Sequence, residues 1–338
     1  MISLGIESTA HTFGCSVVEV SLDNRKSGTI LSDVREVYKG LAGSGIHPRE
    51  ASRHHCNVCS EVLKKSLQQA KMTLKEVDLI AYSAGPGLGP CLRIGAVAAR
   101  AIAAYYGKPL VPVHHAIGHI ELGAMLTGAC DPLVLLVSGG HTMILAFSEN
   151  RWRIFGETLD ITIGQLLDQL GRTMGFASPC GAKIESLADQ SSKKYLRLPY
   201  AVKGNDVSFS GILTSAIRLA SNKNNTKQDV CYSVQETAFA MMMEALERAI
   251  SFTHKKEIMI VGGVAANKRL SEMAQGVCGR HHSNFYVCPP AFAGDNGVQI
   301  AWTAILDYGS SKNRHINIEK SFLRQSWRLD SIDIIWRN

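Results

Sequence analysis

The order of predicted elements repeats once along the chain, although the residues themselves do not repeat. The first round consists, in chain order, of strands at 2–7, 14–20 and 32–38, a helix near 47–71, a strand at 77–85, a helix near 91–106 and a strand at 109–113. The second consists of strands at 133–140, 142–148 and 152–160, helices near 161–175, 181–190 and 228–254, a strand at 257–263, a helix from Asn267, a strand at 284–288 and a last helix from Asp295. Each half opens with antiparallel strands and finishes in parallel βα units. This pattern predicts an α/β fold of two lobes that face each other across a cleft.

The composition fits a globular protein of two domains. The chain has 338 residues, of which 46% are hydrophobic, and this length allows two domains of roughly 150 residues each. The formal charge of +7 is compatible with an anionic partner, but the basic residues are scattered, so an ordinary basic surface is equally compatible. Nine dispersed cysteines, with one CxxC at Cys56 and Cys59, favour reduced thiols in the cytosol or nucleus. The strand-like start "MISLGIE" leaves no room for a targeting peptide, and no apolar run reaches membrane-spanning length.

Three histidines lie in the segment "VHHAIGHIE" (113–121). His115 and His119 are four residues apart, so they share one face of a helix and can aim at a single ion, whereas His114 points elsewhere. A zinc or iron centre needs at least a third protein ligand. Asp295, which ends a proline-rich turn, is either that ligand or the N-cap of the last helix. A helix that carries structural histidines remains the alternative.

Glycine-rich or polar turns open both halves, in "GIESTAHTFG" and in "VSGGHT". Such turns can leave backbone N–H groups free for an anion, and glycine lets the chain approach a phosphate closely. The turn "GGVAAN" (262–267) ends a strand and opens a helix, which suits the nucleoside end of a ligand. Tight turns without a ligand are the alternative. No GxGxxG is present, which argues against a dinucleotide-binding fold.

Three carboxylates lie near the starts of predicted helices in the second half. Asp160 is expected to be a structural N-cap of the helix near 161–175. Asp168 follows "QLL" inside that largely apolar helix, where a carboxylate needs a partner or a ligand. Glu185 lies near the start of the next helix, where either the helix dipole or a ribose hydroxyl would explain it.

Seven motifs carry a resemblance to a known family. They are, in chain order, "GIESTAHTFG", "HHAIGHIE", "LVSGGHT", "GETLD", "DVSFSGI", "GGVAANKRL" and "DNGVQIAW". Together they resemble the tRNA N6-adenosine threonylcarbamoyltransferases, and above all the archaeal and eukaryotic branch, the catalytic subunit of the KEOPS complex, formerly called O-sialoglycoprotein endopeptidase. The resemblance runs from about residue 2 to "RLDSIDIIWR". It implies an actin-like, sugar-kinase-like fold with a nucleotide cleft, in which 1–128 and a returning segment 296–338 form the N-terminal lobe and 129–295 the C-terminal lobe.

The resemblance also implies an activity and partners. A threonylcarbamoyl group would pass from threonylcarbamoyl-AMP to N6 of the adenosine 3′ of the anticodon in tRNAs that read ANN codons. Each subunit would hold one divalent metal ion, iron or zinc. The partners implied are tRNA and KEOPS subunits, including a small kinase-like protein and a dimerising subunit, in the cytoplasm and nucleus. No membrane association is implied.

The resemblance assigns site residues as well. The metal ligands would be His115, His119 and Asp295. The phosphate and acyl end of the donor would meet Val137, Ser138, Gly139 and Gly140. Ribose would meet Asp168 and Glu185, the nucleoside would pass the backbone of Gly181, and Asn267 would bind the base.

Three positions depart from the archaeal pattern. Leu136 stands where that branch has a tyrosine that serves as a further metal ligand, and His141 stands where it has asparagine. The run "LLVSGGHT" instead resembles the bacterial and mitochondrial branch. The usual "GGP" near the ribose reads Gly181, Ala182 and Lys183.

Rival interpretations rest on other patterns. "RHHCNVC" (53–59) offers a second possible metal site through His55, Cys56 and Cys59. A zinc endopeptidase needs HExxH, but Ala116 occupies the position of the glutamate. A non-catalytic ATP-binding scaffold is a further alternative. No serine, cysteine or lysine is arranged with a base as a covalent nucleophile, so transfer is expected by direct, metal-assisted attack.

Overall fold

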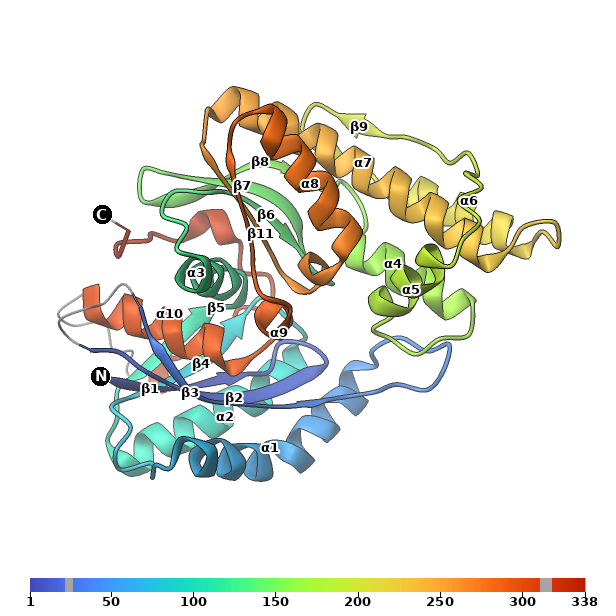
Figure 1. Ribbon diagram of the computed structural model, residues 1–338. Helices are drawn as coiled ribbons and strands as arrows, with labels where there is room; N and C mark the ends of the chain where they lie inside the picture. The colour runs from blue at the N-terminus through green and yellow to red at the C-terminus, as the bar shows by residue number, and fades with distance from the viewer. Residues whose placement is uncertain (22–26, 311–317, 338) are drawn as a thin grey trace.

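Two five-stranded mixed sheets form the framework of the protein (Figure 1). The computed structural model describes residues 1–21, 27–310 and 318–337. The strand orders are β3-β2-β1-β4-β5 and β12-β11-β6-β7-β8. In both sheets the first three strands pair antiparallel and the last two join the first strand in parallel. The predicted duplication of two α/β halves is therefore confirmed at the level of topology.

The first sheet and its outer helices follow the predicted order. Their elements are β1 (Ile2–Glu7), β2 (Thr12–Glu19), β3 (Thr29–Val37), α1 (Pro48–Ala70), β4 (Leu79–Gly85), α2 (Gly89–Tyr106) and β5 (Leu110–His114). Helices α1 and α2 pack on one face of the sheet, where Val62 and Ala99 join Leu4 and Ile80 in an apolar core. Proline near the first turn of α1 and a left-handed Gly107 after α2 mark helix ends in the expected way.

The second half contains a 12-residue helix that the sequence did not predict. Its elements are β6 (Leu133–Val137), β7 (Thr142–Ser148), β8 (Arg151–Glu157), α4 (Ile163–Thr173), α5 (Gly181–Asp189), β9 (Val202–Lys203), β10 (Asp206–Val207), α6 (Ser210–Ser221), α7 (Lys227–Thr253), β11 (Glu257–Val261), η1 (Gly263–Ala266), α8 (Lys268–Arg280) and β12 (Asn284–Val287). The unpredicted helix is α6. Its start is held by Asp160, which accepts hydrogen bonds from Phe209 N and Ser210 N. A cap supplied from 50 residues away leaves no local signal.

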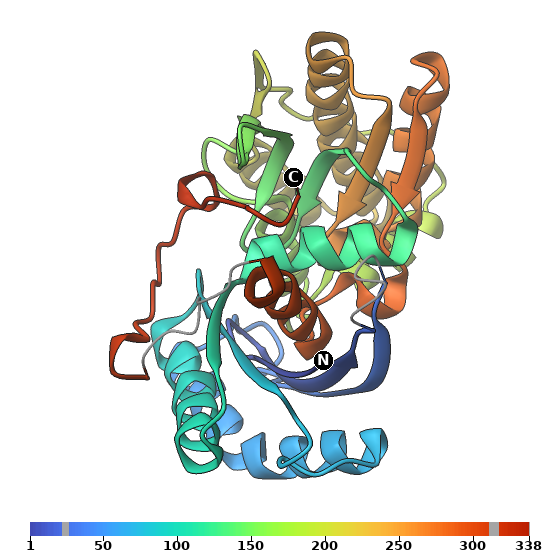
Figure 2. The ribbon, with the colours of Figure 1, turned by 90° about the vertical axis from the view of Figure 1, so that its left-hand side faces the viewer.

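Helices α3 (His115–Thr127) and α10 (Gly297–Ser310) lie between the two sheets (Figures 1 and 2), with the short α9 (Pro290–Ala293) preceding α10. Helix α10 crosses β1 where Gly5 faces Gly297, and a Cβ on Gly297 would lie 2.6 Å from the carbonyl oxygen of Gly5. Helix α3 packs on α10 and β11. Its first nine residues are all buried, as expected of a helix that is covered on every side.

After α10 the chain returns along both lobes. We call residues 318–337, with η2 (Ile318–Lys320) and η3 (Leu329–Ser331), the C-terminal strap. Near its start Arg324 N donates to Ala84 O in the first lobe, and near its end Ile334 N donates to Asn150 O in the second. Figure 2 shows this strap running alongside the two sheets. The strap therefore links the two lobes.

The packing suits the predicted lobes, although their boundaries at 128/129 and 295/296 stay a prediction. Helix α10 packs on the first sheet, as expected of a returning segment. Residues 311–317 and 338 of that segment lie outside the described residues. In the part of the chain that the structure describes, no helix is both long and apolar enough to cross a membrane.

Candidate metal centre and nucleotide site

The three histidines of 113–121 have different surroundings. His114 is the N-cap of α3: its Nδ1 accepts from Ile117 N at 3.4 Å, and its Nε2–H donates to Trp327 O at 3.0 Å. Burial lowers the pKa of His114 to about 3, so the ring is neutral. His114 thus starts the helix and attaches it to the C-terminal strap. The next residue, His115, has a different role, because it faces His119 and Asp295.

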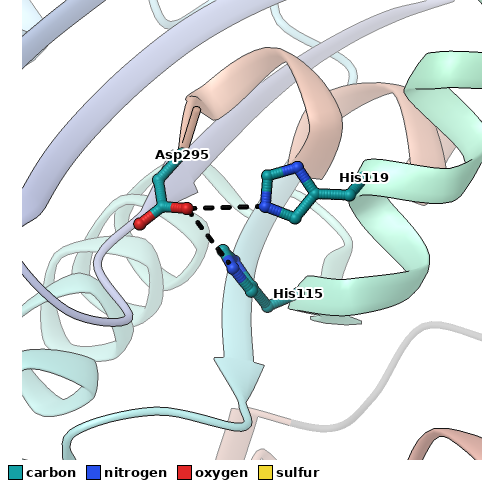
Figure 3. A group of neighbouring side chains, drawn as sticks. All are labelled: His115, His119 and Asp295. Carbon is teal, nitrogen blue, oxygen red and sulfur yellow. Dashed lines mark ion pairs between the residues drawn. The ribbon is translucent and has the colours of Figure 1, made fainter. Parts of the chain in front are cut away.

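His115, His119 and Asp295 converge (Figure 3). The Nε2 atoms of the two histidines lie 3.5 and 3.4 Å from Asp295 Oδ1. Candidate ligand atoms of all three lie within 4.8 Å of one another. Two ligands that each stand about 2.1 Å from one ion at a tetrahedral angle would be about 3.4 Å apart. The separations are longer than ordinary hydrogen bonds and match those of ligands that share an ion.

Two further observations favour a cation at this cluster. His119 Nε2 is buried and has no hydrogen-bond partner within the described residues, whereas buried polar atoms normally have one. Burial alone would raise the pKa of Asp295, but His115 and His119 hold it well below its ordinary value, so the carboxylate is ionised. Burial would likewise lower the pKa of His115, but Glu7 and Asp295 raise it to about 9.

Asp295 is not the N-cap of the last helix. Asn296 takes that role, because its Oδ1 accepts a hydrogen bond from Gln299 N at 2.9 Å. Asp295 therefore lies one residue ahead of the cap, with its side chain turned to α3. Leu136 is fully buried among Ile117 and other apolar residues and offers no ligand atom at the position that the family resemblance singled out.

Two more histidines flank the cluster from equivalent turns of the two lobes. His11 immediately precedes β2, and its Nδ1 lies 3.9 Å from Asp295 Oδ2. His141 immediately precedes β7, and its ring stacks on that of His115 with centroids 6.5 Å apart. The sequence analysis assigned no role to His11. The shared His-Thr pair before the second strand of each half was the signal that could have found it.

The glycine turn after β6 is partly closed by its own serine. Ser138 Oγ accepts from Gly140 N at 3.2 Å and from His141 N at 3.0 Å, so these two amides are not free for an anion, contrary to expectation. Gly139 and Gly140 are exposed, and a Cβ on either would meet no atom within 4 Å. Val137 ends β6 beneath them and is buried. The turn thus leaves space for a ligand next to its two glycines, but the N–H groups of Gly140 and His141 are already hydrogen-bonded.

The remaining candidate residues link helix starts to one another. Asp168 Oδ1 accepts from Cys180 N at 2.6 Å, next to Gly181 at the start of α5. Glu185 Oε1 accepts from Lys268 N at 2.8 Å, at the start of α8. Asp168 and Gly181 thus lie at the N-terminus of α5 and Glu185 contacts that of α8, where partial positive charge favours anions.

Asn267 completes this series as the N-cap of α8. Its Oδ1 accepts from Leu270 N at 3.1 Å and its Nδ2 donates to Gln235 Oε1 at 3.0 Å. Both ends of the buried amide are therefore occupied within the protein. Each end of the amide can still form one further hydrogen bond, so a base could meet Asn267 without displacing these contacts.

Asp160 has a different role from the one predicted. Thr162 caps α4 and forms a capping box with Gln165. Asp160 instead holds the start of α6 through Ser208, Phe209 and Ser210.

The rival interpretations find no support in the geometry. Among residues 1–21, 27–310 and 318–337, one group of His, Cys, Asp and Glu side chains has metal-ligand geometry, and it does not include His55, Cys56 or Cys59. His55 Nε2–H donates to Ala10 O instead, and all nine cysteines are free thiols. Glu121, the acidic residue after the histidine pair, binds Arg337 through both carboxylate oxygens at 2.7 and 3.0 Å. It is therefore not available as the base of a zinc protease.

Solved structures of low sequence identity share the fold. HypF from T. kodakarensis superposes with a TM-score of 0.60 at 14% identity, over 90% of this chain and 47% of that one. The activator of the 2-hydroxyisocaproyl-CoA dehydratase from Clostridium difficile, determined with bound ADPNP, superposes with a TM-score of 0.54 at 11% identity, over 94% and 99%. These similarities confirm the expected fold class, an actin-like and sugar-kinase-like α/β fold of two duplicated lobes.

Sequence comparisons reach the family. Residues 29–302 match the family model described as tRNA N6-adenosine threonylcarbamoyltransferase. A protein of that name from Caldivirga maquilingensis is 47% identical over 336 residues, which cover 99% of this chain and 98% of that protein. Its counterpart from Hyperthermus butylicus is 46% identical over 99% and 91% of the two chains. On this evidence the chain belongs to the tRNA N6-adenosine threonylcarbamoyltransferase family.

Proposed function

We propose that this protein transfers a threonylcarbamoyl group from threonylcarbamoyl-AMP to N6 of the adenosine 3′ of the anticodon, in tRNAs that read ANN codons. Membership of the family supports the reaction, and one structural observation carries it: His115, His119 and Asp295 converge at the junction of the two lobes with metal-ligand spacing. Neither alternative, a metal-dependent glycoprotein endopeptidase or a non-catalytic ATP-binding scaffold, is favoured by any contact in the described residues.

One divalent ion, iron or zinc, would be held by His115 and His119 through Nε2 and by Asp295 through a carboxylate oxygen. When bound, such an ion supplies a Lewis acid for charge that develops on a phosphate or carbonyl oxygen. The protein's own contribution is the preformed arrangement: two histidine Nε2 atoms on one helix face and an ionised carboxylate from the turn before α10. Histidine and carboxylate ligands suit zinc and iron alike.

The adenylate of the donor would extend from the glycine turn to the helix starts of the second lobe. Val137, Ser138, Gly139 and Gly140 would face its phosphate and acyl end, and the open space above the two glycines supports this placement. The ribose and nucleoside would meet Asp168, Gly181, Glu185 and Asn267. The C. difficile activator, which shares the fold, binds ADPNP, and this supports a nucleotide as a ligand.

The reaction needs no covalent enzyme intermediate. The adenine N6 lone pair would form a bond to the carbamoyl carbon, the bond from that carbon to the phosphate oxygen would break, and AMP would leave with the electron pair while N6 loses a proton. Adenine N6 is a weak nucleophile, so the protein acts mainly by fixing donor and acceptor in reacting geometry and by stabilising charge on the leaving group.

We further propose that the protein works with tRNA and with KEOPS subunits, among them a small kinase-like protein and a dimerising subunit, in the cytoplasm and nucleus. The net charge of +7 supports an anionic polymer as substrate. The family resemblance supports the partners and the location.

Reconstitution tests this function. The protein is combined with these partners, an ANN-reading tRNA and threonylcarbamoyl-AMP, and the tRNA nucleosides are analysed by mass spectrometry. We expect threonylcarbamoyladenosine at the position 3′ of the anticodon, together with about one metal ion per chain by elemental analysis. Unmodified tRNA would contradict the transferase, and metal-dependent cleavage of a sialoglycoprotein would replace it with the protease.

Three histidine variants connect the product to the metal. His115→Ala and His119→Ala should each lose metal and product. His114→Ala is the matched control, because it removes a neighbouring buried imidazole that faces Trp327 rather than Asp295. It should retain metal when its fold is verified by circular dichroism. Full metal occupancy in the His115 and His119 variants would return the motif to a structural role.

A further inference from the structure

We infer that Glu7 is a positioning residue that fixes the tautomer of His115 and so makes its Nε2 available to a metal ion. This inference rests on the metal site of the proposed function. Glu7 is the last residue of β1 and its side chain is fully buried. Its carboxylate stands behind His115, on the side away from Asp295.

The two carboxylate oxygens of Glu7 are both occupied. Oε1 accepts from Thr9 N at 2.6 Å and from Thr9 Oγ1 at 2.5 Å. Oε2 lies 2.9 Å from His115 Nδ1 and 3.4 Å from Gln299 Nε2. A carboxylate has about four lone-pair directions, and all of them are met by donors within the protein. Glu7 therefore has no free position for a metal ion or a substrate, and it acts through His115.

The contact to Oε2 decides which nitrogen of His115 carries the proton. A carboxylate accepts only, so His115 Nδ1 must donate to it, and in the neutral ring, the form that binds a metal, the lone pair is then on Nε2. Nε2 is the atom that faces Asp295 Oδ1 at 3.5 Å. Outer-shell carboxylates hold metal-binding histidines in this way in many metalloproteins.

A competing donor shows why an acceptor is needed here. Gln299 Nε2 also lies close to His115 Nδ1, at 3.1 Å. If this amide donated to Nδ1, the proton of the neutral ring would be on Nε2 and would point at the metal position. Glu7 opposes that state, because its Oε2 accepts from both the imidazole and the amide. The two oxygens of one carboxylate thus fix donors from the turn after β1, from α3 and from α10.

Replacement of the carboxylate by an amide tests the inference. In Glu7→Gln the new NH2 group must face either the two Thr9 donors or the donors of His115 and Gln299. One of these pairs of donors then faces another donor and has lost its acceptor. We expect the affinity for Zn²⁺, measured by competition with a chromophoric chelator, to fall about 10- to 100-fold. Glu7→Asp keeps the charge and should fall between wild type and Glu7→Gln.

Glu121→Gln is the matched control. Glu121 is another buried carboxylate and lies on α3 itself, but it binds Arg337 instead of a metal-site histidine. Its Zn²⁺ affinity should equal that of the wild type. An unchanged affinity in Glu7→Gln, with Zn²⁺ bound by the wild type, would overturn the role of Glu7 and leave the proposed function intact. Absence of Zn²⁺ binding by the wild type would instead overturn the metal site itself.

A second measurement does not depend on the stability of a variant. In wild-type protein labelled with ¹⁵N-histidine and loaded with Zn²⁺, long-range ¹H–¹⁵N correlation spectra report which ring nitrogen carries the proton. We expect the proton of His115 on Nδ1 and the metal-shifted resonance on Nε2. The reverse pattern would overturn the inference.

Discussion

At the scale of single residues, histidines with similar neighbours in sequence have different protonation states. His114 and His55 are buried, and each donates Nε2–H to a backbone carbonyl, of Trp327 and Ala10 respectively. His115, one residue after His114, faces two carboxylates, and its pKa is raised whereas those of the other two are lowered. Burial favours the neutral ring, and only a nearby negative charge reverses that preference.

His55 predicts a loss of stability in acid. Its pKa is lowered to about 4, first because of burial and second because of His54, while the unfolded chain has the ordinary value near 6.5. Between these values the unfolded state binds the extra proton, so stability falls as pH falls through this window, by up to about 1.4 kcal/mol per pH unit. Urea unfolding at pH 7, 6 and 5 measures the slope.

His55→Gln isolates this contribution. Glutamine can still donate to Ala10 O but does not titrate, so the variant should show a shallower loss of stability between pH 7 and 5 than the wild type. His254→Gln, at the C-cap of α7, is the control and should keep the wild-type slope. Identical slopes in wild type and His55→Gln would show that folded His55 is protonated as readily as unfolded His55.

The distance along the sequence between contacting residues determines how much of the site could be predicted. Helix periodicity, which relates positions four apart, paired His115 with His119, and Asp295 was a candidate third ligand or N-cap until the family resemblance favoured the ligand. Glu7 and Gln299 were missed because their contacts to His115 join positions 108 and 184 residues apart. No local pattern connects such positions. The roles of Asp168 and Glu185 toward a ligand stay predictions, since each already contacts a backbone N–H.

At the scale of elements, helices whose ends are marked by nearby residues were predicted, whereas α6, whose start is held by a residue distant in sequence, was not. Helices α1, α2 and α7 begin and end within a few residues of their predicted bounds, and α8 begins at its predicted start, because proline, glycine or a capping side chain marks these positions locally. Helix α6 has no side-chain cap of its own. Asp160 supplies the cap across the fold, where the sequence analysis had placed it on α4.

Removal of this distant cap should destabilise α6 selectively. Asp160→Ala deletes the acceptor for Phe209 N and Ser210 N, and we expect a loss of about 1–2 kcal/mol, as for other helix caps. Hydrogen exchange should rise within 210–221 and remain unchanged in α4, whose cap is Thr162. Asp189→Ala, an exposed change at the end of α5, serves as the control. Faster exchange in α4 instead would return Asp160 to its predicted place.

At the scale of the whole molecule, the two ends of the chain meet, because α10 packs on the first sheet. The duplicated order of strands predicted two lobes, and the structure adds that α3 and α10 fill the space between the sheets. Close contact of β1 and α10 depends on glycine at both crossing positions. The turn that carries Asp295 leads directly into α10, so the position of this helix also sets the position of the carboxylate.

Gly5→Ala should therefore disturb stability and metal binding together. A Cβ at this position would overlap backbone atoms of Ala301 and Gly297, which cannot rotate away. We expect a loss of about 3 kcal/mol in urea unfolding, typical of severe overpacking, and weaker Zn²⁺ binding. Gly276→Ala is the control, because a Cβ there meets nothing within 4 Å and alanine favours a helix. Wild-type stability in Gly5→Ala would mean that β1 and α10 are not in close contact.

The crossing of β1 and α10 also matters for folding during synthesis, because the strand leaves the ribosome long before the helix. Glu7 and Gln299, which meet there, are 292 residues apart in the chain. At about 5–20 residues per second of synthesis, roughly 15–60 s pass between the emergence of the first strand and that of its covering helix. During this interval the second lobe, which is nearly continuous in sequence, can fold, whereas the face of the first sheet around Gly5 has no cover. We therefore expect nascent chains to expose this face to chaperones until α10 has left the ribosome.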